Sequence, residues 1–268
     1  MGKLYIIKIG GNIIDDDAKL ASFLKDFATI EGSKILVHGG GKLATKIAEQ
    51  MNIPQQVIDG RRITDAETLK IVTMVYAGYI NKNIVAKLQM NNCNAIGLCG
   101  ADGNAILAHK RPVSPLGDGG DYGFVGDVDA VNTDLINTLL EKNIAVVFAP
   151  ITHNRQGQLL NTNADTIAQE IAKDMSDLYD VQLIYSFEKS GVLLNVYDES
   201  SVIPVITPSY YEELKAPLGG AKIFAGMIPK LDNAFAAFDS GVKKVIIGKA
   251  ENLQALIAGT SGTTIQYD

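Results

Sequence analysis

The sequence predicts an α/β fold built on one mainly parallel β-sheet. Strand-like and helix-like segments alternate along the chain, as they do where crossover helices join parallel strands. An apolar run over Leu4–Ile7 carries β-branched and aromatic side chains that suit a buried strand. A second run over Lys34–Val37 leads directly into three glycines and a helical pattern. We therefore expect a three-layer αβα sandwich around an open sheet.

The spacing of apolar residues predicts the elements in order. In the first part we expect helices over 18–28, 42–51, 67–91, 133–142 and 163–175, and strands over 34–37, 95–98 and 144–151. Between residues 104 and 128, prolines and glycines interrupt short β-like pieces, which predicts hairpins. Further on we expect strands over 181–185, 202–206 and 245–247, and helices over 208–214, 227–240 and 252–258. A lobe boundary falls near the end of the helix over 163–175, giving lobes of residues 1–174 and 175–268.

Composition limits the classes of function. The chain has 268 residues, 47% hydrophobic and 20% charged, which suits a globular protein of one large domain or two lobes sharing a sheet. Its formal net charge of −6 argues against a general nucleic-acid binder, so an anionic substrate would need a local cluster of cations. Cys93 and Cys99 are too few for a disulfide framework or a metal cage. Without a signal peptide or an apolar run that could span a membrane, we expect a cytoplasmic protein with no membrane partner.

The first candidate site follows the first strand. Lys8 stands at the carboxyl end of that strand, and Gly10 and Gly11 come directly after it. Backbone without side chains lets N–H groups approach phosphate oxygens, and the lysine adds a positive charge. The same residues are also consistent with a strand that ends in a glycine turn, with the lysine side chain in solvent.

The second candidate site is the segment His38–Gly41. Three glycines between a buried strand and a helix leave bare N–H groups at the helix N-terminus, where an anion can bind. The spacing is neither the dinucleotide fingerprint nor a Walker A loop. His38 ends a buried strand, and a structural role for it is favoured over a catalytic one.

Two further segments carry charged or amide side chains. Arg61 and Arg62 are the best local candidates for clamping a substrate carboxylate, although the segment also fits a solvated loop in which Thr64 or Asp65 caps the next helix. In the segment 161–165, Asn163 suits a helix N-cap and Asp165 suits the first turn, whereas capping does not explain Asn161. Lys230 lies at the margin of the apolar face of the helix over 227–240, toward a lobe interface, although alone it would be read as a surface lysine.

Taken in order, these segments resemble the amino acid kinase superfamily, most closely its N-acetyl-L-glutamate kinase family. The matching motifs are KIGG at 8–11, VHGGG at 37–41, GRRIT at 60–64, AGYINK at 77–82, GFVGDV at 123–128, LLNTNAD at 159–165 and AGMIPK at 225–230. Seven motifs in one order, from the first strand to at least Gly248, are far more specific than any one of them. The resemblance implies phosphorylation of the γ-carboxylate of an N-acyl-L-glutamate by MgATP, giving an acyl phosphate for arginine biosynthesis.

The resemblance also implies a role for each matching residue. Lys8 and Lys230 would stabilise charge on the transferring phosphoryl group, and Asp165 would hold both lysines. The acylglutamate would be bound by Gly39, Gly40, Arg62, Asn161 and Asn163, with Arg62 rather than Arg61 on its α-carboxylate. The nucleotide would be bound by Gly10, Gly11, Lys189, Ser190, Gly191, Lys222, Ile223 and Phe224. The N-terminal lobe would then bind the acylglutamate and dimerise, and the C-terminal lobe would bind ATP.

A carboxylate is already a nucleophile, so this reaction needs no general base, and the lysines and N–H groups offset charge repulsion. The sequence shows no carboxylate cage for a metal, so we expect Mg²⁺ to be held mainly by the nucleotide phosphates and water.

The chain departs from the family at two places. Where the family usually has Ser/Thr-Asp-Val-Ser/Pro-Gly near the nucleotide, this chain reads SFEKSG at 186–191, so that Phe187 and Glu188 replace a small hydroxyl residue and an aspartate. Arginine-inhibited hexameric members carry an extra helix before the first strand, for which this chain has no room. We therefore expect a homodimer without that control, with its interface along 67–91; the alternative is that this helix only packs on its own sheet.

Several functional alternatives remain. The acyl group is acetyl by default, with succinyl as the alternative, and pocket residues in the segment 117–124 could decide between them. The same fold could phosphorylate glutamate, aspartate, carbamate or a nucleoside monophosphate instead. Because the nucleotide loop is altered, a non-catalytic metabolite sensor on the same scaffold is the alternative from another class of function.

Overall fold

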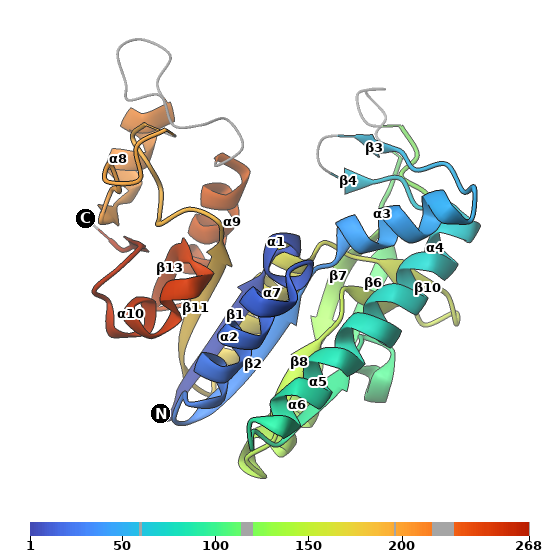
Figure 1. Cartoon of the computed structure of the whole chain (residues 1–268), viewed down its shortest axis with the longest axis horizontal. Helices are drawn as coiled ribbons and strands as arrows, with labels where there is room; N and C mark the ends of the chain where they lie inside the picture. The colour runs from blue at the N-terminus through green and yellow to red at the C-terminus, as the bar shows by residue number, and fades with distance from the viewer. Residues whose placement is uncertain (59–60, 114–119, 196, 216–227, 268) are drawn as a thin grey trace.

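An eight-stranded β-sheet forms the centre of the protein (Figure 1). The computed structural model describes residues 1–58, 61–113, 120–195, 197–215 and 228–267, without the side chains of residues 58, 61, 187, 229 and 230. The strand order is β12-β14-β13-β11-β1-β2-β8-β5, and every neighbouring pair is parallel except β13 and β14. The strands are β1 (Lys3–Ile9), β2 (Ser33–His38), β5 (Ala95–Leu98), β8 (Ala145–Phe148), β11 (Asp180–Phe187), β12 (Val205–Ile206), β13 (Lys244–Lys249) and β14 (Thr263–Ile265). The predicted α/β fold with a mainly parallel sheet is confirmed.

Helices cover both faces of this sheet and bury a separate apolar cluster on each (Figure 1). One layer contains α2 (Asp17–Ala28), α3 (Gly41–Gln50), α4 (Ala66–Val72), α5 (Asn81–Met90) and α10 (Leu253–Ala258). The other contains α6 (Thr133–Glu141), α7 (Ala164–Met175), α8 (Pro208–Lys215) and α9 (Ile228–Asp239). The chain also forms three short helical turns, α1 (Gly11–Ile14), η2 (Asp102–Asn104) and η4 (Ala250–Asn252). This arrangement is the three-layer sandwich predicted from the sequence.

Strand β1 shows how the period of two along a strand positions the site. Leu4 and Ile6 are buried in the cluster under α7, whereas Tyr5 and Ile7 are buried in the cluster under α2. Successive side chains of a strand point to opposite faces, so Lys8 belongs to the face of Leu4 and Ile6. The apolar part of β1 therefore delivers the lysine to the N-terminus of α7.

Two smaller sheets lie beside the large one. A four-stranded sheet has the order β10-β9-β6-β7, formed by β6 (Ile106–Lys110), β7 (Gly126–Val131), β9 (Ile151–His153) and β10 (Leu159–Asn161). Strands β3 (Val57–Ile58) and β4 (Arg61–Arg62) form an antiparallel pair. The antiparallel pairing of β6 and β7 confirms the hairpin predicted between residues 104 and 128, of which residues 114–119 lie outside the described part.

The single strand predicted over 144–151 is wrong. The chain leaves the large sheet after Phe148 and enters the small sheet at Ile151, with Pro150 at the junction. Proline has no N–H to continue a strand ladder, so the apolar run serves two sheets instead of one. Within 202–206 only Val205–Ile206 forms a strand of the large sheet, while Val202 makes an isolated bridge to Leu193.

The helix predicted over 67–91 is present, but its winding changes in the middle. Between α4 and α5 lies η1, a π-helix over Thr73–Ile80. π-Helical turns are rare and occur frequently at functional sites. Residues of η1 and the first residue of α5 pack against the glycine segment after β2.

The proposed boundary between lobes does not interrupt the large sheet. Strand β11 pairs with β1 from Lys3 and Asp180 to Ile9 and Ser186. The division at residues 174 and 175 therefore stays a prediction. None of the described helices is long and apolar enough to cross a membrane.

Candidate active site

The candidate residues gather at the carboxyl edge of the large sheet, where the strand order reverses. From β1 the sheet grows through β2 in one direction, and from β11 it grows through β13 in the other. The loops at such a reversal diverge and leave a crevice, which is where ligands bind in open α/β sheets. The glycine segments after β1 and β2 and the N-terminus of α7 meet there.

Lys8 and Asp165 form an ion pair at this edge. The Nζ atom of Lys8 lies 2.7 Å from Oδ1 of Asp165, and the two side chains are 13% and 17% exposed. Asp165 is in the first turn of α7, where the positive end of the helix dipole favours its ionised form. The pair holds the ammonium group of Lys8, which lines a cavity at this edge, in a fixed direction.

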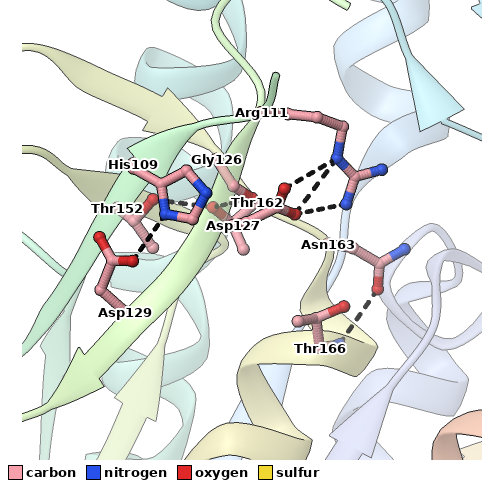
Figure 2. Close-up of polar contacts among 9 residues, drawn as sticks. All are labelled: His109, Arg111, Gly126, Asp127, Asp129, Thr152, Thr162, Asn163 and Thr166. Carbon is pink, nitrogen blue, oxygen red and sulfur yellow. Dashed lines mark hydrogen bonds and ion pairs between the residues drawn. The ribbon is translucent and has the colours of Figure 1, made fainter. Parts of the chain in front are cut away.

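Asn163 is the N-cap of α7 and binds backbone N–H groups of its first turn. Its side-chain oxygen accepts hydrogen bonds from the N–H groups of Asp165 and Thr166, at 2.7 and 3.3 Å. This N-cap was predicted, and Figure 2 shows the contact to Thr166. With the oxygen used by the helix, the amide NH₂ of Asn163 is the part that can serve a ligand.

The glycine segment after β2 forms the second part of the site. The Gly39 N–H donates to the carbonyl of Ile9 at 3.1 Å, which joins the ends of β1 and β2. Gly40 has a φ of 151°, and a Cβ there would lie 2.3 Å from Cδ1 of Ile80 on η1. Only glycine fits this backbone and this close approach, so the bare backbone is imposed by packing as well as by ligand access.

Arg62 supplies an uncompensated positive charge. Its Nη2 donates to the Gly41 carbonyl at 2.9 Å and to the Thr45 hydroxyl at 2.7 Å, and its Nη1 donates to the side chain of Gln55. These partners are neutral, and no carboxylate pairs with Arg62 within the described ranges. A guanidinium held by neutral groups keeps its charge available for a carboxylate.

Two cavities meet at Gly41. The first, of about 200 Å³, is lined by Gly39, Gly40, Gly41, Val57, Arg62, Tyr76, Val125, Pro150, Asn161, Thr162, Asn163 and Ala164. The second, of about 430 Å³, is lined by Lys8, Gly10, Gly11, Asn12, Ile13, Gly41, Lys42 and Glu188. The first has the groups that suit a carboxylate and an amide, and the second has those that suit phosphate. Because they share Gly41, molecules in the two would be neighbours.

The end of β10 in the small sheet, with the residue that follows it, contributes Asn161 and Thr162 to the lining of the first cavity, and Figure 2 shows the polar contacts around Thr162. The Thr162 hydroxyl donates to the carbonyl of Gly126 at 3.1 Å and lies 2.7 Å from the Thr152 hydroxyl. Beside it, Arg111 Nε lies 3.1 and 3.2 Å from the two carboxylate oxygens of Asp127. Arg111 is therefore compensated by a carboxylate, in contrast to Arg62.

Burial changes the proton affinity of three side chains around the site. Burial, opposed by the hydrogen bond to Gly39 and aided by the charge of Lys82, lowers the pKa of His38 to about 4. Burial, followed by the nearby charge of Asp165, raises the pKa of Tyr185 well above its ordinary value. Burial also raises the pKa of Tyr76, which the neighbouring Arg62 partly offsets. At neutral pH all three side chains are uncharged, so the site's charges are those of its lysines, Arg62 and its carboxylates.

The predicted residues fall into three groups. The structure brings Lys8, Asp165, Gly10, Gly11, Gly39, Gly40, Arg62, Asn161 and Asn163 together. Lys189 pairs instead with Glu199 at 2.8 Å, Ser190 donates to the same carboxylate, and Gly191 packs against Thr263. Lys222, Ile223, Phe224 and the side chains of Arg61 and Lys230 lie outside the described part, so the convergence of two lysines stays a prediction.

Sequence reasoning missed several residues of the cavities. Thr45 and Gln55 support Arg62, and Tyr76 and Thr162 line the first cavity. Lys42 lines the second and donates to the side chain of Asn12. Its place directly after the glycine triplet was the available signal. Tyr76 gave no signal, because an aromatic residue in a helical apolar pattern is most often core.

Among the described residues, no group of three or more histidine, cysteine, aspartate or glutamate side chains is arranged to hold a metal ion. A divalent ion at this site would need ligands from another molecule as well as from the protein. The oxygens of a polyphosphate are ligands of that kind.

The fold and the site together define an α/β protein with two adjoining cavities, one with groups that suit a carboxylate and one with groups that suit phosphate. The sequence profile of the amino acid kinase family matches residues 3–249, and the chain belongs to this family.

The curated relatives point in the same direction. The chain is 58% identical over 257 residues to the acetylglutamate kinase of Cytophaga hutchinsonii, covering 96% of this chain and 95% of that one. It is 52% identical over 264 residues to the acetylglutamate kinase of Bacteroides thetaiotaomicron, covering 98% of each. Among solved structures, smu.665 from Streptococcus mutans UA159 superposes with a TM-score of 0.78 at 28% identity, covering 99% of both chains. A carbamate kinase from Giardia, at 16% identity and a TM-score of 0.72, shows the same fold.

Proposed function

We propose that this enzyme transfers the γ-phosphoryl group of ATP to the γ-carboxylate of an N-acyl-L-glutamate, with acetyl as the acyl group. The observation that carries the proposal is the meeting of the two cavities at Gly41, with Arg62 in one and Lys8 in the other. Relatives named acetylglutamate kinase at more than 50% identity support the choice of acceptor. The product is an acyl phosphate, which fits a place in arginine biosynthesis.

The first cavity would hold the acylglutamate. The guanidinium of Arg62 binds the α-carboxylate, since a planar donor pair matches two carboxylate oxygens. Asn161 and Asn163 present amide groups to the acyl amide and the backbone of the substrate. The γ-carboxylate then reaches the glycine segment, where backbone N–H groups donate hydrogen bonds to its oxygens.

The second cavity would hold the phosphates of the nucleotide. Lys8 neutralises charge that develops on the transferring phosphoryl group, and Asp165 keeps the ammonium in place before ATP arrives. Because this charge is positioned in advance, the protein need not reorganise during the reaction. The attacking carboxylate is ionised at neutral pH, so the residues have only to align the two reactants and offset their repulsion. Lys230 would take the matching place on the other side of the phosphoryl group.

Mg²⁺ fits the donor set as a companion of the nucleotide. Lone carboxylates near the phosphate cavity, such as Glu188, suit water-mediated contact with an ion that keeps much of its hydration shell. When bound, the ion would offset phosphate charge; the protein residues named above would bind and orient the two substrates.

A homodimer in the cytoplasm is the expected form. On the segment of α4, η1 and α5, the side chains of Met74, Tyr79 and Met90 are 55%, 65% and 72% exposed. Large apolar side chains exposed along one segment are typical of an interface between protein copies. This segment is the one for which the family resemblance implies dimerisation.

The test is ADP release with MgATP and a panel of acceptors. The panel holds N-acetyl-, N-succinyl- and unmodified L-glutamate, L-aspartate and carbamate, and trapping of the acyl phosphate by hydroxylamine identifies the product. We expect the highest kcat/KM with N-acetylglutamate. A preference for N-succinylglutamate would change the acyl group, and a preference for aspartate or carbamate would contradict the acceptor. Binding of acylglutamate without turnover would favour the sensor.

A further inference from the structure

Asn81 and Lys82 belong to the motif AGYINK at 77–82, for which the proposed reaction gives no role. Asn81 is the first residue of α5, directly after η1, and its side chain is fully buried. Its Nδ2 atom lies 3.0 Å from the carbonyl oxygen of Val147 on β8 and 3.2 Å from Nε2 of His38 on β2. Its Oδ1 atom lies 3.0 Å from Nζ of Lys82. The side chain thus links α5 to two strands of the large sheet.

The neighbouring strand is shaped to admit this amide. A Cβ on Gly97 of β5 would lie 1.9 Å from Oδ1 of Asn81, so any other residue there would displace the amide. Lys82 Nζ also donates to the Gly97 carbonyl at 2.6 Å, which holds the ammonium against the amide. The position of Asn81 is therefore fixed by packing as well as by hydrogen bonds.

The partners of Asn81 decide which way its amide faces. A backbone carbonyl can only accept and an ammonium can only donate. The NH₂ group therefore faces Val147 and His38, and the oxygen faces Lys82. It follows that Nε2 of His38 accepts a hydrogen bond and carries no proton.

The same reasoning places the proton of His38 on the other ring nitrogen. Nδ1 lies 2.8 Å from the carbonyl oxygen of Gly39, and that oxygen can only accept. His38 is thus neutral with its proton on Nδ1, which donates to Gly39. A chain of donors runs from Lys82 through Asn81 and His38 to the backbone of the glycine segment.

We infer that Lys82, Asn81 and His38 are positioning residues that lock the peptide between Gly39 and Gly40 in its ligand-binding orientation. The C=O and N–H of a trans peptide point in opposite directions. With the Gly39 carbonyl held by the buried imidazole, the N–H of Gly40 is directed away from that carbonyl, and Gly40 lines the first cavity. There it donates to an oxygen of the anion in that cavity; the identity of that anion, the acylglutamate, rests on the proposed function.

The charges around His38 suit this role. The elements that pack on the same face as His38 carry titratable groups, among them Lys42 on α3, Tyr76 on η1 and Lys82 on α5, whereas Lys8 on β1 belongs to the opposite face of the sheet. Burial is the main cause that opposes protonation of the ring, the hydrogen bond to Gly39 acts against it, the charge of Lys82 adds to it, and the pKa of His38 falls to about 4. The imidazole therefore stays neutral through the pH range in which a kinase works, and its proton stays on Nδ1.

Nitrogen-15 NMR of the imidazole rings reads this arrangement directly. The chain has three histidines, so spectra of the wild type, His109→Gln and His153→Gln assign His38. We expect a neutral ring protonated on Nδ1 at pH 7, with or without substrate. A ring protonated on Nε2, or on both nitrogens, would overturn the inference. In Asn81→Asp a carboxylate oxygen replaces the NH₂ group, so Nε2 should become protonated; an unchanged spectrum would show that Asn81 does not set the tautomer.

Two variants of His38 separate positioning from space filling. In His38→Asn the amide NH₂ takes the place of Nδ1 and can still donate to Gly39, whereas in His38→Gln it takes the place of Nε2. We expect KM for the acylglutamate to rise about tenfold in His38→Gln, the effect of losing one ordinary hydrogen bond, and about twofold in His38→Asn. A space-filling role predicts the reverse, since glutamine is closer to histidine in size. The NMR result does not depend on turnover, so an inactive wild type would contradict the proposed function and leave this inference testable.

Discussion

The ammonium group of Lys8 lies 2.7 Å from a carboxylate oxygen of Asp165, at the point where the ends of β1 and β2 meet the start of α7. The two residues are far apart in the sequence, on β1 and in the first turn of α7, so the pair depends on the tertiary fold. It holds a cation in place before any substrate binds. The first prediction tests whether that cation carries the reaction.

Lys8→Ala should lower kcat by about a hundredfold, which corresponds to about 3 kcal/mol of transition-state stabilisation. The side chain is only 13% exposed, and its removal takes away one of the positive charges in the second cavity, the one held by Asp165. Steady-state ADP release measures the change. Lys3→Ala removes an exposed lysine from the same strand and should leave kcat unchanged. A kcat for Lys8→Ala within a few-fold of wild type would remove the lysine from the mechanism.

Arg62→Lys should raise KM for the acylglutamate by about tenfold, with a smaller change in kcat and in KM for ATP. A lysine keeps the charge but loses the planar pair of donors that matches a carboxylate. Arg155→Lys, in an exposed turn, is the control and should match the wild type. If KM for the acylglutamate does not change in Arg62→Lys, the α-carboxylate binds elsewhere, with Arg61 the next candidate.

The parts of this site that the sequence predicts lie at or directly after the carboxyl ends of strands. Lys8, Gly10 and Gly39 each lie within two residues of a strand end, and parallel strands bring such ends to one edge. Asn163 and Asp165 could be placed because a cap and a first-turn acid have recognisable positions. The choice of Arg62 over Arg61 came from family likeness and not from local pattern.

Other features required the three-dimensional structure. The apolar run over 144–151 does not show that Pro150 divides it between two sheets, and the helical pattern over 67–91 does not show a π-helical centre. Asn81 looks like a polar position on a surface helix, yet Gly97 on another strand leaves room to bury it. Such contacts depend on segments far apart in sequence, which local patterns do not encode.

Gly40→Ala should destabilise the protein by about 3 kcal/mol. Part of this loss is backbone strain at a φ of 151°, and part is the contact with Ile80, 2.3 Å from the added Cβ. Urea unfolding followed by circular dichroism measures the free energy. Gly157→Ala is the matched control, because its φ is also positive at 82° but nothing lies within 4 Å of the added Cβ. It should cost about 1 kcal/mol, and equal losses in the two variants would contradict the packing of Gly40 against Ile80.

Tyr79→Glu should shift the protein from dimer to monomer. Tyr79 is 65% exposed on η1, in the segment proposed as the interface, and a buried unpaired carboxylate opposes association. Analytical ultracentrifugation at micromolar concentration gives the mass. Tyr197→Glu changes a tyrosine that is 95% exposed in another part of the chain and should leave the mass unchanged. A Tyr79→Glu dimer as stable as the wild type would place the interface elsewhere.

His38 should make the folded state sensitive to acid. Its pKa falls from 6.5 to about 4 on folding, mainly because of burial, so between these values the unfolded chain binds more protons than the folded one. The free energy of unfolding should therefore be highest above pH 6.5 and fall as the pH decreases toward 4. For this one group the loss between pH 7 and pH 4.5 is about 2 kcal/mol.

The variant His38→Asn isolates that term, because asparagine does not titrate. Its free energy of unfolding should fall less between pH 7 and pH 4.5 than that of the wild type, even though its value at pH 7 is lower. Replacing His109, whose side chain is 53% exposed, by asparagine should leave the wild-type dependence on pH. Urea unfolding at several pH values gives the three curves. If the curve of His38→Asn runs parallel to that of the wild type, the imidazole is not held neutral in the folded protein. His38 would then not link Asn81 to the carbonyl of Gly39 as inferred.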